Sequence, residues 1–68
     1  MGKDVFKKLG AKIRELRKEK HLTQKQLGLA AEVSHNFIGT IERGQANPSI
    51  DILSNIAEVL GITLKILF

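Results

Sequence analysis

Three polar side chains at helical spacing, His35, Asn36 and Thr40, carry the chemistry that this sequence offers. An asparagine amide forms two hydrogen bonds with adenine N6 and N7. The imidazole of His35 can donate to guanine N7 or O6, and Thr40 offers a hydroxyl to a base or a methyl group to thymine. Together with Gly39, these residues would form the exposed face of a helix in the major groove of double-stranded DNA. The alternative is a solvated, polar first turn.

Two capped helices joined by a turn would hold that face in place. Thr23 followed by Gln26 matches a capping box, and Ser34 can cap the next helix. We therefore expect one helix at about 23–31 and a second at about 34–43, with the apolar residues of the second opposite its polar face. Two helices joined by a short turn, the second free to enter a groove, is the geometry of a helix-turn-helix DNA reader.

The pattern extends over roughly residues 9–68. The segment LTQKQL (22–27) is followed by IERG (41–44) and NPS (47–49). This compound pattern resembles the helix-turn-helix family of lambdoid phage repressors and Cro proteins, the Cro/C1 or XRE family. It also resembles the controller proteins of restriction–modification systems, which share the fold. The resemblance implies an all-α, five-helix bundle of the lambda-repressor-like type, as a single DNA-binding domain over residues 1–68.

The same resemblance implies roles for further residues. Arg17 and Glu42 match a pair that, in the family, joins the first helix to the end of the third, so we expect a structural ion pair and not a DNA contact. Gln24 matches a position that binds a backbone phosphate at a helix N-terminus, where free N–H groups attract anions. The phosphate contacts expected at helix starts and after the recognition helix are Thr23, Gln24, Lys25, Ser34, Arg43, Gln45 and Asn47.

Basic residues dominate the first twenty positions. The formal net charge is +4 and the pI about 9.8, which favours an anionic partner. Eight of the eleven lysines and arginines lie between residues 3 and 20, around an apolar stripe at positions 6, 9, 13 and 16. Most of these cations must therefore point outward. A solvated helix face explains Lys3, Lys7, Lys8 and Lys18, whereas Lys12 and Arg14 could face a phosphate strand.

Composition argues against several other classes of protein. The 68 residues include no cysteine, and the two histidines are too far apart to suggest a metal site. Neither a glycine-rich phosphate loop nor an HExxH helix is present, nor a supported Ser/His/Asp set, so we expect neither an enzyme nor a cofactor. No apolar run approaches the ~18 residues of a membrane span, and no signal-peptide pattern occurs. A cytoplasmic protein without membrane contact is therefore expected.

Three further helices complete the expected fold. The first should run from an N-cap at Asp4 to about Lys20, and the fourth from a cap at Ser49 to Gly61. The tail at 64–68 should form a fifth, although its alternating apolar residues also fit a strand. The expected core consists of Leu9, Ile13, Leu16, Leu22, Leu27, Ala31, Val33, Ile38, Ile41, Leu53, Ile56 and Leu60.

Three positions depart from what helices and turns of this kind prefer. Glu32 stands where the family commonly has glycine, because the turn takes a positive φ, and this costs about 1 kcal/mol. Gly28 lets two backbones approach closely, yet it should weaken its helix by ~1 kcal/mol relative to alanine. Gly39 carries the same penalty. It either admits a close backbone or base, or is a neutral surface substitution.

The chain ends in five large apolar residues, Ile62, Leu64, Ile66, Leu67 and Phe68. They exceed what a small core takes up, and exposed apolar clusters usually mark an interface. A two-fold homodimer would place two recognition helices about 34 Å apart, facing a palindromic site. The alternative is that this segment folds back and completes the core of the monomer.

The sequence therefore predicts a sequence-specific DNA-binding transcriptional regulator, a repressor or controller that acts as a dimer on a palindromic operator. The alternative is an antitoxin-type interaction module that binds a toxin and represses its own operon. The residues do not choose between repressor, activator and controller, and they do not identify the operator or its half-site spacing. They also leave open whether the chain is a fragment of a longer protein.

Overall fold

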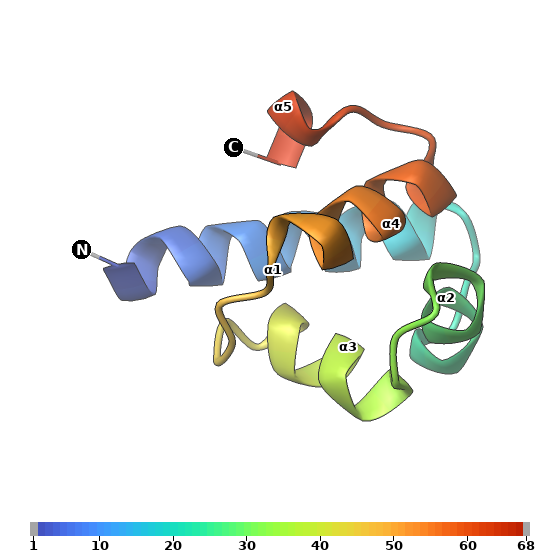
Figure 1. Cartoon of the computed structure of the whole chain (residues 1–68), viewed down its shortest axis with the longest axis horizontal. Helices are drawn as coiled ribbons and strands as arrows, with labels where there is room; N and C mark the ends of the chain where they lie inside the picture. The colour runs from blue at the N-terminus through green and yellow to red at the C-terminus, as the bar shows by residue number, and fades with distance from the viewer. Residues whose placement is uncertain (1, 68) are drawn as a thin grey trace.

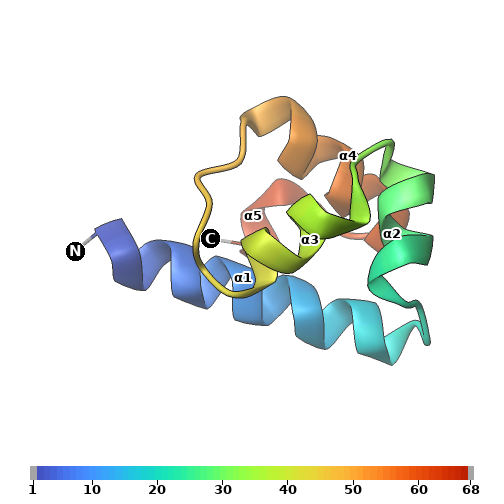
Figure 2. The ribbon, with the colours of Figure 1, turned by 90° about the horizontal axis from the view of Figure 1, so that it is seen from below.

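Residues 2–67, which the computed structural model describes, form five α-helices and no strand (Figure 1). The helices are α1 (Gly2–Glu19), α2 (Gln24–Ala31), α3 (His35–Glu42), α4 (Ile50–Leu60) and α5 (Leu64–Leu67). The all-α prediction is confirmed, and residues 64–67 are helical and do not form a strand. Seen from below, α1 runs the length of the molecule beside α3 (Figure 2). α3 packs against α1 and α2, α4 packs against α2, and α5 contacts α1 and α4.

Hydroxyl side chains begin three of the helices, as expected. The side chains of Thr23, Ser34 and Ser49 accept hydrogen bonds from the N–H groups three residues on, and Thr23 forms the full capping box with Gln26. The predicted N-cap at Asp4 is wrong, because α1 already begins at Gly2. Asp4 instead lies in the first turn, where its carboxylate interacts favourably with the positive end of the helix dipole.

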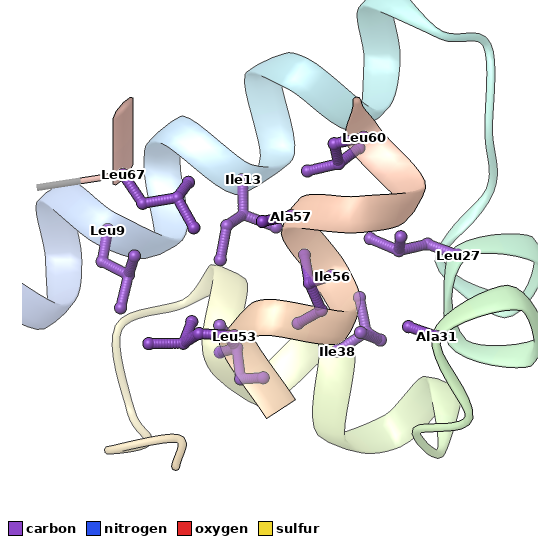
Figure 3. Close-up of a cluster of buried hydrophobic side chains, with 11 residues drawn as sticks. Leu9, Ile13, Leu27, Ala31, Ile38, Leu53, Ile56, Ala57, Leu60 and Leu67 are labelled. Carbon is purple, nitrogen blue, oxygen red and sulfur yellow. The ribbon is translucent and has the colours of Figure 1, made fainter. Parts of the chain in front are cut away.

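The core is a single apolar cluster that draws on all five helices (Figure 3). Its members are Leu9, Ile13, Leu27, Ala31, Ile38, Ile41, Leu53, Ile56, Ala57, Leu60 and Leu67. Leu16, Leu22 and Val33, predicted as core residues, are only half-buried. Leu22 and Val33 lie in the links after helix ends, and Leu16 lies in the last turns of α1. Of the three, Leu16 and Val33 pack against the edge of the cluster.

Four helices end in the same left-handed turn. The residues with positive φ are His21 (58°), Glu32 (61°), Gly44 (75°) and Gly61 (72°). In each case the next N–H reaches back five residues, as in the bonds from Leu22 N to Arg17 O (3.1 Å) and from Val33 N to Gly28 O (2.8 Å). The positive φ of Glu32 was predicted, whereas that of His21 was not, since no glycine marks it.

Two glycines set the position of α3. A Cβ atom on Gly28 would lie 2.5 Å from the Val33 carbonyl oxygen and 3.2 Å from His35 N. The close approach expected at Gly28 is confirmed, and the expected gain from alanine there is wrong because alanine does not fit. A Cβ on Gly10 of α1 would overlap the carbonyl oxygen of Ile41. No role was predicted for Gly10, although it lies on the buried side of α1.

None of the helices within residues 2–67 combines the length and apolar character needed to cross a bilayer.

Replacing the strained turn residue after α2 should stabilise the protein. Because Glu32 adopts the left-handed conformation that costs a side-chain residue about 1 kcal/mol, Glu32→Gly should raise the free energy of unfolding by up to ~1 kcal/mol. Urea denaturation followed by circular dichroism measures this. The matched control is Lys8→Gly on the exposed side of α1, which should lower stability by about 1 kcal/mol. A loss of stability in both variants would show that Glu32 is not strained.

Candidate nucleic-acid interface

The first turn of α3 presents His35 and Asn36 to solvent. Ser34 accepts a hydrogen bond from the Phe37 N–H (3.2 Å) and so fixes the start of the helix. Ile38 is fully buried in the core, which holds α3 by the opposite side. His35 and Asn36 are exposed. This turn therefore offers an imidazole and an amide on a rigidly held surface.

The second turn differs from the prediction. Gly39 was expected on the exposed face, but it is buried, because the side chains of Arg43 and Gln24 cover it. The Thr40 hydroxyl donates to the Asn36 carbonyl (3.0 Å) and accepts from Arg43 Nη2 (3.4 Å). Thr40 is half-buried. The Thr40 hydroxyl is thus already hydrogen-bonded to Asn36 and Arg43. The side chains of Arg43 and Gln24 lie over the backbone of Gly39.

Beneath this face lies a buried ion pair. Arg17 donates from Nε to Glu42 Oε2 (2.7 Å) and from Nη2 to Glu42 Oε1 (3.0 Å). Its Nη1 donates to the Leu22 carbonyl (2.8 Å), and Gln24 Nε2 donates to Glu42 Oε1 (3.1 Å). Only 8% of Arg17 and 9% of Glu42 is exposed. The pair therefore joins α1, the link after it, the first residue of α2 and the end of α3.

The partner carboxylate also fixes the charge of the arginine. Hydrogen bonding to Glu42 raises the pKa of Arg17, while burial opposes the shift and the charge of the carboxylate adds to it. Because the pKa of Arg17 is raised in the folded state, the stability that this ion pair contributes is fully present below the ordinary arginine pKa. It is lost only as the pH rises through the higher pKa of the folded state. The guanidinium is therefore charged throughout the physiological pH range.

The residues expected to contact phosphate fall into three groups. Gln24, Arg43 and Gln45 come together, since Arg43 Nε donates to Gln45 Oε1 (3.1 Å) and the Arg43 and Gln24 side chains meet over Gly39. Thr23 and Ser34 serve as N-caps, as described above. Lys25 and Asn47 are exposed. Among residues 2–67, no group of three or more His, Asp or Glu side chains is placed to hold a metal ion.

The sequence matches a protein-family model described as helix-turn-helix over residues 13–67. The chain belongs to the helix-turn-helix family. The predicted resemblance to the Cro/C1 (XRE) type is thereby confirmed. A curated relative is the ImmF control region 10 kDa protein of Bacillus phage phi105, which is 43% identical over 90% of this chain and 68% of its own length. The chain spans only 44% of the length of the regulator DdrOP3 of Deinococcus deserti and 40% of that of the immunity repressor protein of Bacillus phage phi105.

Solved structures of this family share the fold of this chain. The restriction–modification controller protein C.AhdI from Aeromonas hydrophila has a TM-score of 0.89 and 35% identity, over 96% of this chain and 97% of its own. The biofilm regulator SinR, solved in complex with DNA, has a TM-score of 0.83 and 35% identity, over 87% of this chain and 95% of its own. The first of these proteins is a controller protein, and the second is a master regulator for biofilm formation.

Breaking the buried pair of this helix-turn-helix protein on one side only should be strongly destabilising. Arg17→Met leaves the Glu42 carboxylate buried with Gln24 as its one side-chain donor, and we expect a loss of about 3–5 kcal/mol in the free energy of unfolding. The double variant Arg17→Met/Glu42→Leu should recover a large part of that loss, because it removes the unpaired charge. Guanidinium denaturation measures both.

The control for this experiment is the exposed pair between Lys12 and Glu15 (3.3 Å). Lys12→Met should change stability by less than about 1 kcal/mol, because surface pairs are weak. A double variant no more stable than Arg17→Met would contradict the expectation that the unpaired charge causes the loss.

Proposed function

We propose that this chain is a sequence-specific DNA-binding transcriptional regulator that inserts α3 into the major groove, as a single DNA-binding domain. The observation that carries the proposal is the exposed first turn of α3, held against the core by Ile38 and the buried pair. Further support comes from the similarity in fold to SinR, whose structure was solved with DNA. The similarity of this chain to the phage control protein and to the controller protein C.AhdI favours a repressor or controller over an antitoxin.

In this proposal, His35 and Asn36 read base edges. Both side chains are exposed at the start of α3, the part of a recognition helix that reaches the bases. Thr40 contributes its methyl group, since its hydroxyl is already bonded. The starts of α2 and α3 and the loop after α3 contact phosphates, through Thr23, Gln24, Lys25, Ser34, Arg43, Gln45 and Asn47. These contacts position the helix without carrying sequence information.

The protein would bind a palindromic operator as a homodimer through its C-terminal segment. Ile66 is 52% exposed, and Ile62 and Leu64 are half-buried. Leu67 is buried in the core of the same chain, so it contributes to the monomer and not to this surface. Phe68 lies outside the described residues. The proposed interface is therefore Ile62, Leu64 and Ile66, a small apolar surface that would give a weak dimer promoted by DNA.

Removing the amide that reads adenine should relax sequence preference. We expect Asn36→Ala to cost about 1–3 kcal/mol at the best site and to reduce discrimination at one base pair. The measurement is selection of bound duplexes from a random pool, followed by titration of cognate and random duplexes. Gln26→Ala, which alters the exposed capping box of α2, is the control that should leave base preference unchanged. Equal weakening of cognate and random DNA by Asn36→Ala would remove Asn36 from the base-reading role.

A charge on the exposed C-terminal residue should prevent dimerisation. Ile66→Asp should give a monomer at concentrations where the native chain dimerises, because a carboxylate is costly to bury in an apolar interface. Sedimentation equilibrium gives the oligomeric state. The matched control is Leu29→Asp on α2, since Leu29 is 73% exposed and lies outside this segment. A native chain that stays monomeric at high micromolar concentration, with palindrome affinity unchanged by Ile66→Asp, would refute the interface.

A further inference from the structure

A hollow of about 530 Å³ opens between the N-terminal half of α1 and the loop that joins α3 to α4 (Figure 2). Phe6 and Lys7 line it from α1, and residues 43–47 line it from the loop. Its volume lies within the roughly 300–1,000 Å³ that small-molecule sites in proteins occupy. Neither Phe6 nor Lys7 belongs to the apolar core or to the buried ion pair, so this part of α1 has no role in either.

The loop is anchored on both sides of the hollow. A Cβ atom on Gly44 would lie 2.8 Å from Lys7 Cα and 2.7 Å from Lys7 Cγ, so the loop backbone lies directly on α1 at this point. Gly44 has the positive φ of 75° that glycine adopts without strain. Further along the loop, Ala46 packs against the apolar core and Pro48 is buried. The hollow is therefore formed before any ligand binds.

The wall of the hollow combines two cations with an apolar surface. Lys7 and Arg43 are exposed, and no carboxylate among the described residues lines the hollow. Neither cation takes part in the two salt bridges found within residues 2–67. Phe6 contributes an aromatic ring and Ala46 a methyl group, and both residues are half-buried. Such a wall suits a molecule that joins a negative charge to an apolar body.

Arg43 belongs both to this wall and to the proposed DNA interface. It is one of the residues proposed to contact phosphate, and its Nε already donates to Gln45 Oε1 (3.1 Å) within the same loop. A carboxylate bound at Arg43 neutralises the guanidinium and adds a negative charge beside the path of the DNA backbone. An anion in the hollow therefore opposes the phosphate contact at this position.

We propose that this hollow binds a small organic anion, a carboxylate joined to an apolar body of the size of a phenyl ring, and that the bound anion weakens DNA binding. Lys7 and Arg43 hold the carboxylate, and Phe6 and Ala46 contact the apolar body. The effect on DNA rests on the proposed function, whereas the binding of the anion does not. The concentration of such an anion then controls the affinity for the operator.

Titration with 3-phenylpropionate, followed by proton–nitrogen correlation NMR, tests the binding. The amide signals of residues 6–7 and 43–47 should shift together with a single dissociation constant. Two further probes separate charge from ring: 3-phenylpropionamide is uncharged, and propionate has no ring. Each should bind about tenfold or more weakly, because each lacks one of the two contacts. Propionate that binds as well as 3-phenylpropionate would reveal an adventitious ion only, and would overturn the proposal.

Substitution of one cation distinguishes the hollow from the rest of the basic helix. Lys7→Gln should weaken the binding of 3-phenylpropionate about tenfold, because it removes one of the two charges that hold the carboxylate. Glutamine keeps the Cγ atom against which Gly44 packs. The matched control is Lys8→Gln, since Lys8 is exposed and does not line the hollow. An equal effect of the two substitutions would show that the anion responds only to the charge of α1, and would overturn the site.

Competition with DNA tests the regulatory effect. The affinity of the native chain for a duplex selected from a random pool should fall several-fold in saturating 3-phenylpropionate. The reference is the same concentration of propionate, which matches the ionic strength. Lys7→Gln should lose most of this response, and Lys8→Gln should keep it. An unchanged DNA affinity at saturation would overturn the regulatory effect. A native chain that binds no selected duplex would refute the proposed function itself, while the NMR titration would still decide whether the anion site exists.

Discussion

The pair between Arg17 and Glu42 fixes the geometry on which the interface depends. Two charges are removed from water, and their desolvation is offset by a bidentate geometry and by bonds to Leu22 O and Gln24. No buried side-chain nitrogen or oxygen in the described part of the chain lacks a partner. Because directional bonds of this kind tolerate little displacement, the pair specifies how α1, α2 and α3 meet. Apolar packing alone would hold these helices together but would fix their relative positions less closely.

Backbone contacts complete this arrangement on both sides of α3. Gly10 lets α1 touch the carbonyls at the end of α3, and Gly28 lets α2 touch the turn that precedes it. The start and the end of α3 are therefore each set by direct approach to another backbone. Side chains such as His35 and Asn36 then need only project from a helix whose position is already determined.

Local signals made the helix boundaries predictable from sequence. Thr23, Ser34 and Ser49 each satisfy a free N–H near their own position in the chain, so their effect can be inferred without a tertiary structure. The burial of Gly39 was not predictable, because it depends on where Arg43 and Gln24 place their ends. The role of Gly10 was missed because it depends on the approach of α3, whereas the positive φ of His21 was missed because no glycine marks it. Arg17 and Glu42 lie twenty-five positions apart, and only family resemblance joined them beforehand.

The two surfaces with a proposed function, on α3 and on the C-terminal segment, differ in how they are packed. α3 is packed against two other helices, whereas α5 has four residues and buries only Leu67 among those described. The hydrogen-bonded amide protons in the packed turns of α3 should therefore exchange with solvent at a higher free energy of opening than those of α5, which can open locally. Mild denaturant will consequently loosen the C-terminal segment first. The helix proposed to read DNA will then remain folded on a chain whose proposed dimer surface has already opened.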